Sequence, residues 1–209
     1  MTVISVDLSN RPYDIHVRAG LLADVGAVLT PYARNGRMLV VTDENVAQAV
    51  LPKFEATLRD AGIACATFTL PAGEAGKSWT QLERLTDWLL EQHVERSDHI
   101  IALGGGKTID TAKGLAANLD VPIIVCPTIA SSDAPTSRLI VLYDEEHKVV
   151  GVEFLKMNPA AVIVDTEVIV QAPARFFAAG IGDAISKKFE ARQCYAAGGH
   201  NSFGTPPLH

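Results

Sequence analysis

Three consecutive glycines stand between an apolar run and a helical pattern in IIALGGGKTIDTAKGLA, residues 100–116. Glycines at the carboxyl end of a buried strand let backbone N–H groups approach a phosphate, and the N-terminus of the next helix attracts its negative charge. The spacing is neither the GxGxxG of dinucleotide-binding folds nor a Walker loop. The residues alone leave two interpretations open: a phosphate-binding turn, or a tight strand-to-helix turn that binds nothing.

Other chemistry-bearing residues form no recognisable site by their spacing. The chain has no GxSxG, HExxH or Walker sequence, the local signatures of serine hydrolases, zinc proteases and P-loop enzymes. Its three cysteines lie far apart without a CxxC pair, which is typical of buried thiols rather than of metal ligands. The six histidines occur singly, at predicted element ends, in a turn and among the last ten residues, and nothing gathers them into a metal site.

The composition restricts the class of protein. The chain has 209 residues, 48% hydrophobic and 20% charged, which suits one large domain or one domain plus a fragment. A net charge of −6 argues against a nucleic-acid partner, because no basic surplus exists to neutralise phosphates. No apolar stretch approaches the ~20 residues that span a bilayer, and the first ten residues do not resemble a signal peptide. We therefore expect a cytoplasmic protein without a membrane partner.

Strand and helix patterns alternate along most of the chain. Residues 1–19 predict a β-hairpin, and five apolar runs predict buried strands at 37–42, 63–70, 99–103, 122–126 and 161–165. Helical patterns lie between them at 45–62, where Pro52 should kink or divide the helix, at 78–93, where Ser78 and Gln81 form a capping box, and at 107–119. This alternation predicts an α/β fold with a doubly wound, mainly parallel, Rossmann-like sheet.

Two later segments depart from the alternation. Residues 139–155 contain two strand-like runs joined by an acidic turn, which predicts an additional antiparallel hairpin. From residue 173 the pattern becomes helical and amphipathic, so we expect C-terminal helices to follow the sheet.

From the glycines onward the sequence resembles the glycerol dehydrogenases, which are NAD- and metal-dependent members of the iron-containing alcohol dehydrogenase superfamily. The resemblance rests on three stretches in the family's order: GGGKTIDTAKGLA, then PTIASSDAPTS at residues 127–137, then NPAAVIVDTEVIVQAPARFFAAGIGDAISKKFEAR at residues 158–192. The family's TDAP motif has one conservative departure, because Ser132 stands before Asp133 here.

Upstream of the glycines the sequence instead resembles 3-dehydroquinate synthase, in YDIHVRAGLL, VVTDENV and LPAGEAGKSW followed by DHIIALGGG. That family continues with a Gly-Asp-containing helix, and this chain does not. We therefore predict a chimera joined at or near residues 104–106, with a divergent natural homologue as the alternative. Residues 1–172 would form an NAD-binding α/β domain, synthase-like over 1–103 and dehydrogenase-like over 104–172. Residues 173–209 would begin a truncated helical domain.

Together the resemblances imply a fold of the dehydroquinate synthase-like superfamily and an NAD site made of two halves. The synthase-like half implies nucleotide contacts from Asp43, Asn45, Glu74 and Lys77, with a solvated helix start as the alternative for the last two. The dehydrogenase-like half implies that the pyrophosphate is held by Gly105, Gly106, Lys107 and Thr108. It also implies a nicotinamide end lined by Thr128, Ser131, Ser137, Leu139 and Tyr143.

The dehydrogenase resemblance further implies a metal-assisted reaction. Asp133 falls at the family's substrate-contacting position, and Asp183 in GIGDA matches its one metal-ligating carboxylate in this half of the protein. Zinc or iron would act there as a Lewis acid on a substrate hydroxyl. The family's other two ligands are histidines from a downstream helical domain that this sequence lacks, so we expect weak or no metal binding.

We therefore predict an NAD(H)-binding domain with little or no turnover. Two alternatives stay open. One is an NAD- and metal-dependent glycerol dehydrogenase, converting glycerol to dihydroxyacetone with ligands supplied by a partner chain. The other is a chimeric folding scaffold with no ligand. An apolar face around Phe176, Phe177 and Ile181, which further helices would cover, favours self-association into a homodimer.

Overall fold

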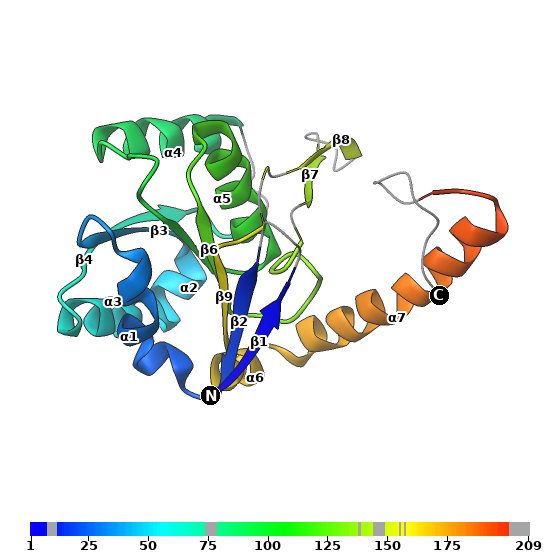
Figure 1. The fold of residues 1–209 in the computed structure, drawn as a ribbon, viewed down its shortest axis with the longest axis horizontal. Helices are drawn as coiled ribbons and strands as arrows, with labels where there is room; N and C mark the ends of the chain where they lie inside the picture. Colours follow the sequence, from blue (N-terminus) through cyan, green and yellow to red (C-terminus); the bar gives the residue numbers. More distant parts are fainter. Residues whose placement is uncertain are drawn as a thin grey trace.

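A seven-stranded sheet forms the centre of the molecule, in the order β1-β2-β9-β6-β5-β3-β4 (Figure 1). The computed structural model describes residues 1–7, 12–73, 79–137, 139–143, 149–154, 156 and 158–200. The strands are β1 (Thr2–Val6), β2 (Tyr13–Arg18), β3 (Arg37–Asp43), β4 (Ala64–Leu70), β5 (Ile100–Gly104), β6 (Ile123–Pro127) and β9 (Ala161–Asp165). All neighbouring pairs are parallel except β1 with β2, which form the predicted hairpin.

Helices cover both faces of the sheet, which confirms the predicted doubly wound architecture. They are η1 (Leu21–Ala23), α1 (Val25–Leu29), η2 (Thr30–Tyr32), α2 (Glu44–Ala49), α3 (Leu51–Asp60), α4 (Trp79–Glu91), α5 (Gly106–Leu119), α6 (Thr166–Gln171) and α7 (Ala174–Ala196). The division at Pro52 predicted for the helix at 45–62 is observed, because α2 and α3 are separated at Val50 and Pro52 lies in the first turn of α3.

Two hydrophobic clusters form the core, one on each face. Alternate residues of β3 point in opposite directions, so Met38 and Val40 pack with η1, α1 and α3, while Leu39 and Val41 pack with α4 and α5. Burial on both faces explains why β3, β5 and β6 read as continuous apolar runs. None of the described helices combines the length and apolar character needed to cross a bilayer.

The chain reverses its direction across the sheet at β3. This strand pairs with β4 on one side and with β5 on the other, so the path runs outward to β4 and then returns past β3. The helices that follow β3 and β5 lie on opposite faces (Figure 1). In parallel sheets such a reversal opens a crevice at the carboxyl ends of the two strands. This crevice should therefore lie beside Asp43 and Gly104, where these strands end.

Two segments stand outside the main sheet. Strands β7 (Leu139–Tyr143) and β8 (Val149–Phe154) form the predicted antiparallel hairpin as a separate sheet. Helix α7 projects away from the sheet and carries the last described residues (Figure 1). It begins directly after α6, close to the predicted boundary between residues 172 and 173.

Candidate cofactor site

A cavity of about 860 Å³ lies at the carboxyl ends of β3 and β5. This is the position that the chain reversal favours, and the volume falls within the usual range for small-molecule sites. Its walls come from the first turns of α2 and α5, from the loop after β6, and from η1, α6 and the start of α7. The cavity therefore draws on residues from both sides of the glycine turn.

Asp43 organises one end of this cavity. Its Oδ1 accepts hydrogen bonds from the backbone N–H of Asn45 at 3.0 Å and of Val46 at 3.2 Å, which caps α2. Its Oδ2 accepts a 3.0 Å hydrogen bond from the hydroxyl of Thr108 in the first turn of α5. The carboxylate that we expected at a ribose thus also has a structural task, because it joins two helix starts.

The three glycines have different roles. A Cβ on Gly104 would lie 2.8 Å from the side chain of Thr108, so the close packing of strand and helix requires this glycine. A Cβ on Gly105 would meet the end of Ile129 at 2.7 Å, a flexible group that lines the cavity. A Cβ on Gly106 would make only ordinary contacts, the nearest at 3.6 Å to Ser132 Oγ. Protein packing therefore does not require glycine at position 106.

Most of the expected cofactor residues meet at the cavity wall. Asp43, Asn45, Gly105, Gly106, Lys107, Thr108, Thr128 and Ser131 line it. Ser137 and Leu139 do not line this cavity: the carbonyl oxygen of Ser137 accepts a hydrogen bond from Lys113 of α5, and Leu139 begins β7. Glu74, Lys77 and the side chain of Tyr143 lie outside the described residues.

Sequence reasoning missed the opposite wall. It comes from η1, α6 and the start of α7, with Leu22, Glu167, Val168, Gln171, Arg175 and Phe176. The guanidinium of Arg175 lies 4.7 Å from the centre of the Phe176 ring. Phe176 is therefore a cavity residue rather than part of the exposed face on which we placed it. No local pattern signals these residues, because they reach the cavity through the position of β9 between β2 and β6 in the sheet.

Asp133 and Asp183, the expected substrate and metal residues, lie side by side. The backbone N–H of Asp133 donates a 3.1 Å hydrogen bond to Asp183 Oδ2. The ammonium of Lys187 lies 3.5 Å from a carboxylate oxygen of each. Partial burial lowers the pKa of Lys187, but the neighbouring carboxylates outweigh this effect and raise the pKa above its ordinary value. A lysine thus already balances the two acidic groups.

A close approach of α7 holds this pair together. A Cβ on Gly180 would lie only 2.1 Å from the carbonyl oxygen of Ala130, so α7 touches the loop backbone at this glycine. Asp183 lies one turn further along the same helix. The glycine contact therefore sets the position of Asp183 relative to Asp133.

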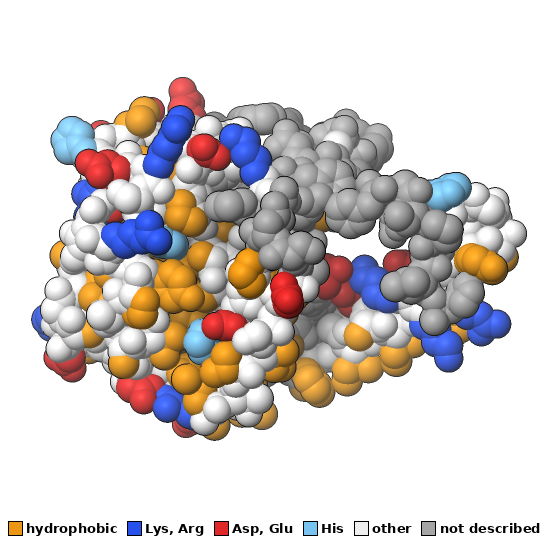
Figure 2. Space-filling view, viewed as in Figure 1, with side chains coloured by type: hydrophobic (Ala, Val, Ile, Leu, Met, Phe, Trp, Pro, Cys, Tyr) orange, Lys and Arg blue, Asp and Glu red, His pale blue; other side chains and the backbone are white. Residues whose placement is uncertain are grey.

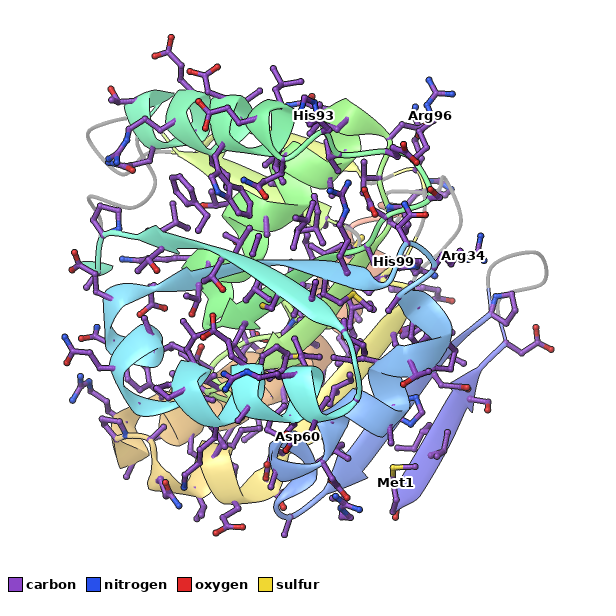
Figure 3. The ribbon with its side chains drawn as sticks, turned by 90° about the vertical axis from the view of Figure 1, so that its left-hand side faces the viewer. Met1, Arg34, Asp60, His93, Arg96 and His99 are labelled. Atoms are coloured by element: carbon purple, nitrogen blue, oxygen red, sulfur yellow. The ribbon has the colours of Figure 1, made fainter. Side chains whose placement is uncertain are left out.

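The described residues do not fit a zinc or iron site at Asp183. No group of three His, Cys, Asp or Glu side chains in the described chain could hold a metal ion. His93 and His99 precede β5 at the opposite edge of the sheet, near Arg34 and Arg96 (Figure 3). His99 is buried beside the ring of Tyr32. The cluster of Asp133, Asp183 and Lys187 is therefore an ion-pair network.

Lys113 is a further residue that sequence reasoning missed. Its side chain is fully buried in α5, and its ammonium donates to the carbonyl oxygens of Ala134 and Ser137. Burial lowers the pKa of Lys113 to about 8, against the opposing effect of Asp110 and Asp133. The sequence does carry a signal for it, since Lys113 lies one helical turn after buried Ile109 and one turn before buried Ala116.

The surface of α7 carries an apolar stripe. Phe177, Ile181, Ile185 and Phe189 recur at every fourth position and are 59%, 47%, 56% and 62% exposed. Figure 2 shows hydrophobic side chains along the lower edge of this helix. The face that we expected to be uncovered is thus present, and it extends further along the helix than the sequence suggested.

The chain belongs to the iron-containing alcohol dehydrogenase family, whose model matches residues 12–166. It is 40% identical over 186 residues to a 3-dehydroquinate synthase of Zymomonas mobilis, a match covering 87% of this chain and 48% of that protein. It is 39% identical over 180 residues to a glycerol dehydrogenase of Escherichia coli, covering 86% and 47%. Both resemblances predicted from the motifs are confirmed.

A crystal structure of 2-deoxy-scyllo-inosose synthase complexed with carbaglucose-6-phosphate, NAD+ and Co2+ shares the fold, with a TM-score of 0.77 at 19% identity. The match covers 89% of this chain and 52% of that one. The chain thus spans about half the length of these three proteins. Each matched stretch is long enough to run through the glycine turn, so the join at residues 104–106 stays a prediction.

Proposed function

We propose that this chain binds NAD(H) in the cavity at the carboxyl ends of β3 and β5, with the pyrophosphate at the N-terminus of α5. The main support for this proposal comes from Gly106, the first residue of this helix. It lines the cavity, although the packing of the protein does not require a glycine there. A missing side chain at a helix N-terminus leaves room for a phosphate against the backbone N–H groups. α5 has 14 residues, long enough for a substantial dipole.

The two ends of the cavity suit the two nucleosides. Towards β3, Asp43 and Asn45 offer polar atoms to a ribose, and Val168 and Gln171 of α6 form the facing wall. Towards β6, Thr128 and Ser131 line the cavity beside the loop that carries Asp133. A dinucleotide centred on α5 would therefore span from α2 to this loop. The shared fold of the NAD+-bound inosose synthase is in keeping with this placement.

Calorimetric titration with NAD tests the proposal. We expect Gly106→Ala to weaken NAD binding by roughly tenfold or more, because the added methyl group stands where the phosphate approaches. Gly114→Ala is the matched control, since it lies in the same helix and its Cβ would meet nothing within 4 Å. Wild-type protein that binds no NAD, or equal losses in both variants, would reject the proposal and leave a folding scaffold without a ligand.

We further propose that this chain alone turns over little or no substrate. Lys187 stands between Asp133 and Asp183, where the dehydrogenase resemblance implies a metal ion, and the described residues supply no imidazole there. What the chain's own residues can do is hold the dinucleotide and orient it. Turnover of glycerol with NAD, measured with and without added Zn2+, should stay at the level of a Gly106→Ala blank.

Glycerol dehydrogenase is the second candidate function, and the contact between Asp133 and Asp183 favours it. The 3.1 Å hydrogen bond brings together the two residues that the family resemblance assigns to substrate and metal. NADH formation from glycerol that depends on Zn2+ and is lost in Asp183→Asn would establish this activity. Such a result would overturn the proposal of an inactive domain but leave the cofactor site intact.

We propose that the apolar stripe of α7 mediates a homodimer. Its four exposed side chains lie on one face of a helix that projects from the molecule (Figure 1). Two copies could pair these stripes and remove them from water, which is the usual reason for self-association of such a surface.

A further inference from the structure

The buried, positively charged side chain of Lys113 binds two backbone oxygens. Its side chain is 0% exposed, and its ammonium donates to Ala134 O and, at 2.5 Å, to Ser137 O. Burying an ammonium is costly unless hydrogen bonds compensate for the lost water. The carboxylates of Asp110 and Asp133 add electrostatic attraction, yet burial still lowers the pKa of Lys113 to about 8. A methionine would fill the same space without this cost.

Both acceptors lie in the loop of residues 128–137, which follows β6. The first part of this loop, with Thr128, Ile129 and Ser131, forms one wall of the cavity. Near its middle, the backbone carbonyl oxygen of Asp133 accepts hydrogen bonds at 3.1 Å from the backbone N–H groups of Thr136 and Ser137. A shift of residues 134–137 would therefore move Asp133 as well.

Other contacts hold the start and the centre of the loop, where the N–H of Asp133 donates to Asp183 Oδ2 at 3.1 Å and Lys187 lies 3.5 Å from the Asp133 carboxylate. At its start the N–H of Thr128 donates to Gly104 O at 3.0 Å, and near its centre the backbone of Ala130 touches Gly180. At its far end the described hydrogen bonds to the body of the protein are the two that Lys113 makes from α5, and Ala134 also packs against the core. The same helix thus presents its N-terminus to the cavity and holds the adjoining loop through a side chain two turns later.

We propose that Lys113 is a positioning residue, which fixes the 128–137 loop and so shapes the end of the cavity next to β6. The identity of the ligand rests on the proposed function. The claim that Lys113 fixes the loop does not depend on that function. A dinucleotide whose pyrophosphate lies at α5 reaches this loop with one nucleoside only. ADP, which ends at the pyrophosphate, would extend from α5 towards β3 and leave the loop untouched.

Lys113→Met tests the inference in the full chain, with Lys188→Met at an exposed position of α7 as control. Hydrogen–deuterium exchange should become about tenfold faster in residues 128–137 and remain unchanged in β3 and β5. NAD binding should weaken by roughly tenfold, and ADP binding should stay within about twofold of wild type. A general loss of structure would instead affect both ligands and all strands alike.

Unchanged exchange in the loop of a folded Lys113→Met variant would overturn the inference, and so would equal weakening of NAD and ADP. Lys113→Gln, which keeps an N–H donor, should restore part of the loop protection; it also replaces Lys113→Met if that variant does not fold. If wild-type protein binds no NAD, the proposed function fails, but the exchange experiment still decides the role of Lys113.

Discussion

Thr108 Oγ1 donates a 3.0 Å hydrogen bond to Asp43 Oδ2, which joins two side chains 65 positions apart in the sequence. Asp43 ends β3 and caps α2, whereas Thr108 lies in the first turn of α5. The bond therefore ties together the two helix starts that flank the cavity. It also crosses the predicted join at residues 104–106, so side chains from both sides hold the glycine turn in place.

Thr108→Val should remove this bond with little change in volume. We expect the free energy of unfolding to fall by about 1 kcal/mol, the usual net value of a buried hydrogen bond, together with weaker NAD binding. Urea denaturation and calorimetry measure the two effects. Thr86→Val is the control, because among the described residues its hydroxyl donates to Leu82 O within the same helix, α4. Equal effects of both substitutions would show that the bond to Asp43 has no special role.

Gly180→Ala should separate α7 from the loop after β6. Its Cβ would lie 2.1 Å from Ala130 O, so the helix must shift, at an expected cost of about 1–3 kcal/mol in unfolding free energy. Gly182→Ala, whose Cβ would meet nothing within 4 Å, should instead stabilise the helix by about 0.5–1 kcal/mol. Thermal or urea denaturation that ranks the two variants in the opposite order would contradict the close packing described here.

The buried charge of Lys113 predicts a pH-dependent stability. Its pKa is about 8 in the folded protein and 10.5 in the unfolded chain, so between these pH values the unfolded chain binds more protons. The free energy of unfolding should therefore rise with pH across this window, and below about pH 8 the cost of burying the charge is constant.

Lys113→Met removes this titration. Relative to the variant, wild-type protein should gain roughly 1–3 kcal/mol between the two ends of the window. Urea denaturation of both proteins at several pH values measures the difference. A difference that stays flat with pH would mean that the amine titrates alike in the folded and unfolded states.

The α7 stripe predicts a concentration-dependent dimer. Ile185→Glu places a charge in the middle of the stripe and should make the protein monomeric in sedimentation velocity experiments at micromolar concentrations. Val170→Glu, on α6 at a site that is 77% exposed, should leave the dimer unchanged. Wild-type protein that sediments as a monomer throughout would reject this interface.

The sequence allowed the main sheet to be predicted from local patterns, and the family resemblances named residues that form one wall of the cavity. Buried strands read as apolar runs when both faces are covered, and the glycine turn stands at the end of one of them. Asp43, which the synthase resemblance assigns to the nucleotide, directly follows such a run and lines the cavity. The carboxyl ends of parallel strands meet at one edge, so residues in these positions converge without any knowledge of strand order.

The rest of the site depends on contacts that no local pattern contains. Gln171 and Phe176 reach the cavity because β9 pairs with β2 and carries α6 to that side. Lys187 enters the acidic cluster through the approach of α7 at Gly180. Such contacts follow from tertiary packing, which sequence periodicity does not encode.

The pairing of β2 with β9 has a consequence for how the protein folds. Asp165, at the end of β9, accepts hydrogen bonds from Gly20 N and Leu22 N, 145 and 143 positions earlier in the chain. Strand β2 therefore cannot form its parallel pairing until β9, much later in the chain, has formed. Contacts between residues so far apart in the sequence favour slow folding. Residues 1–103 alone would leave β2 without β9 and β5 without β6, exposing unpaired backbone at both. The two halves should accordingly unfold in a single step, as one cooperative unit rather than as interchangeable modules.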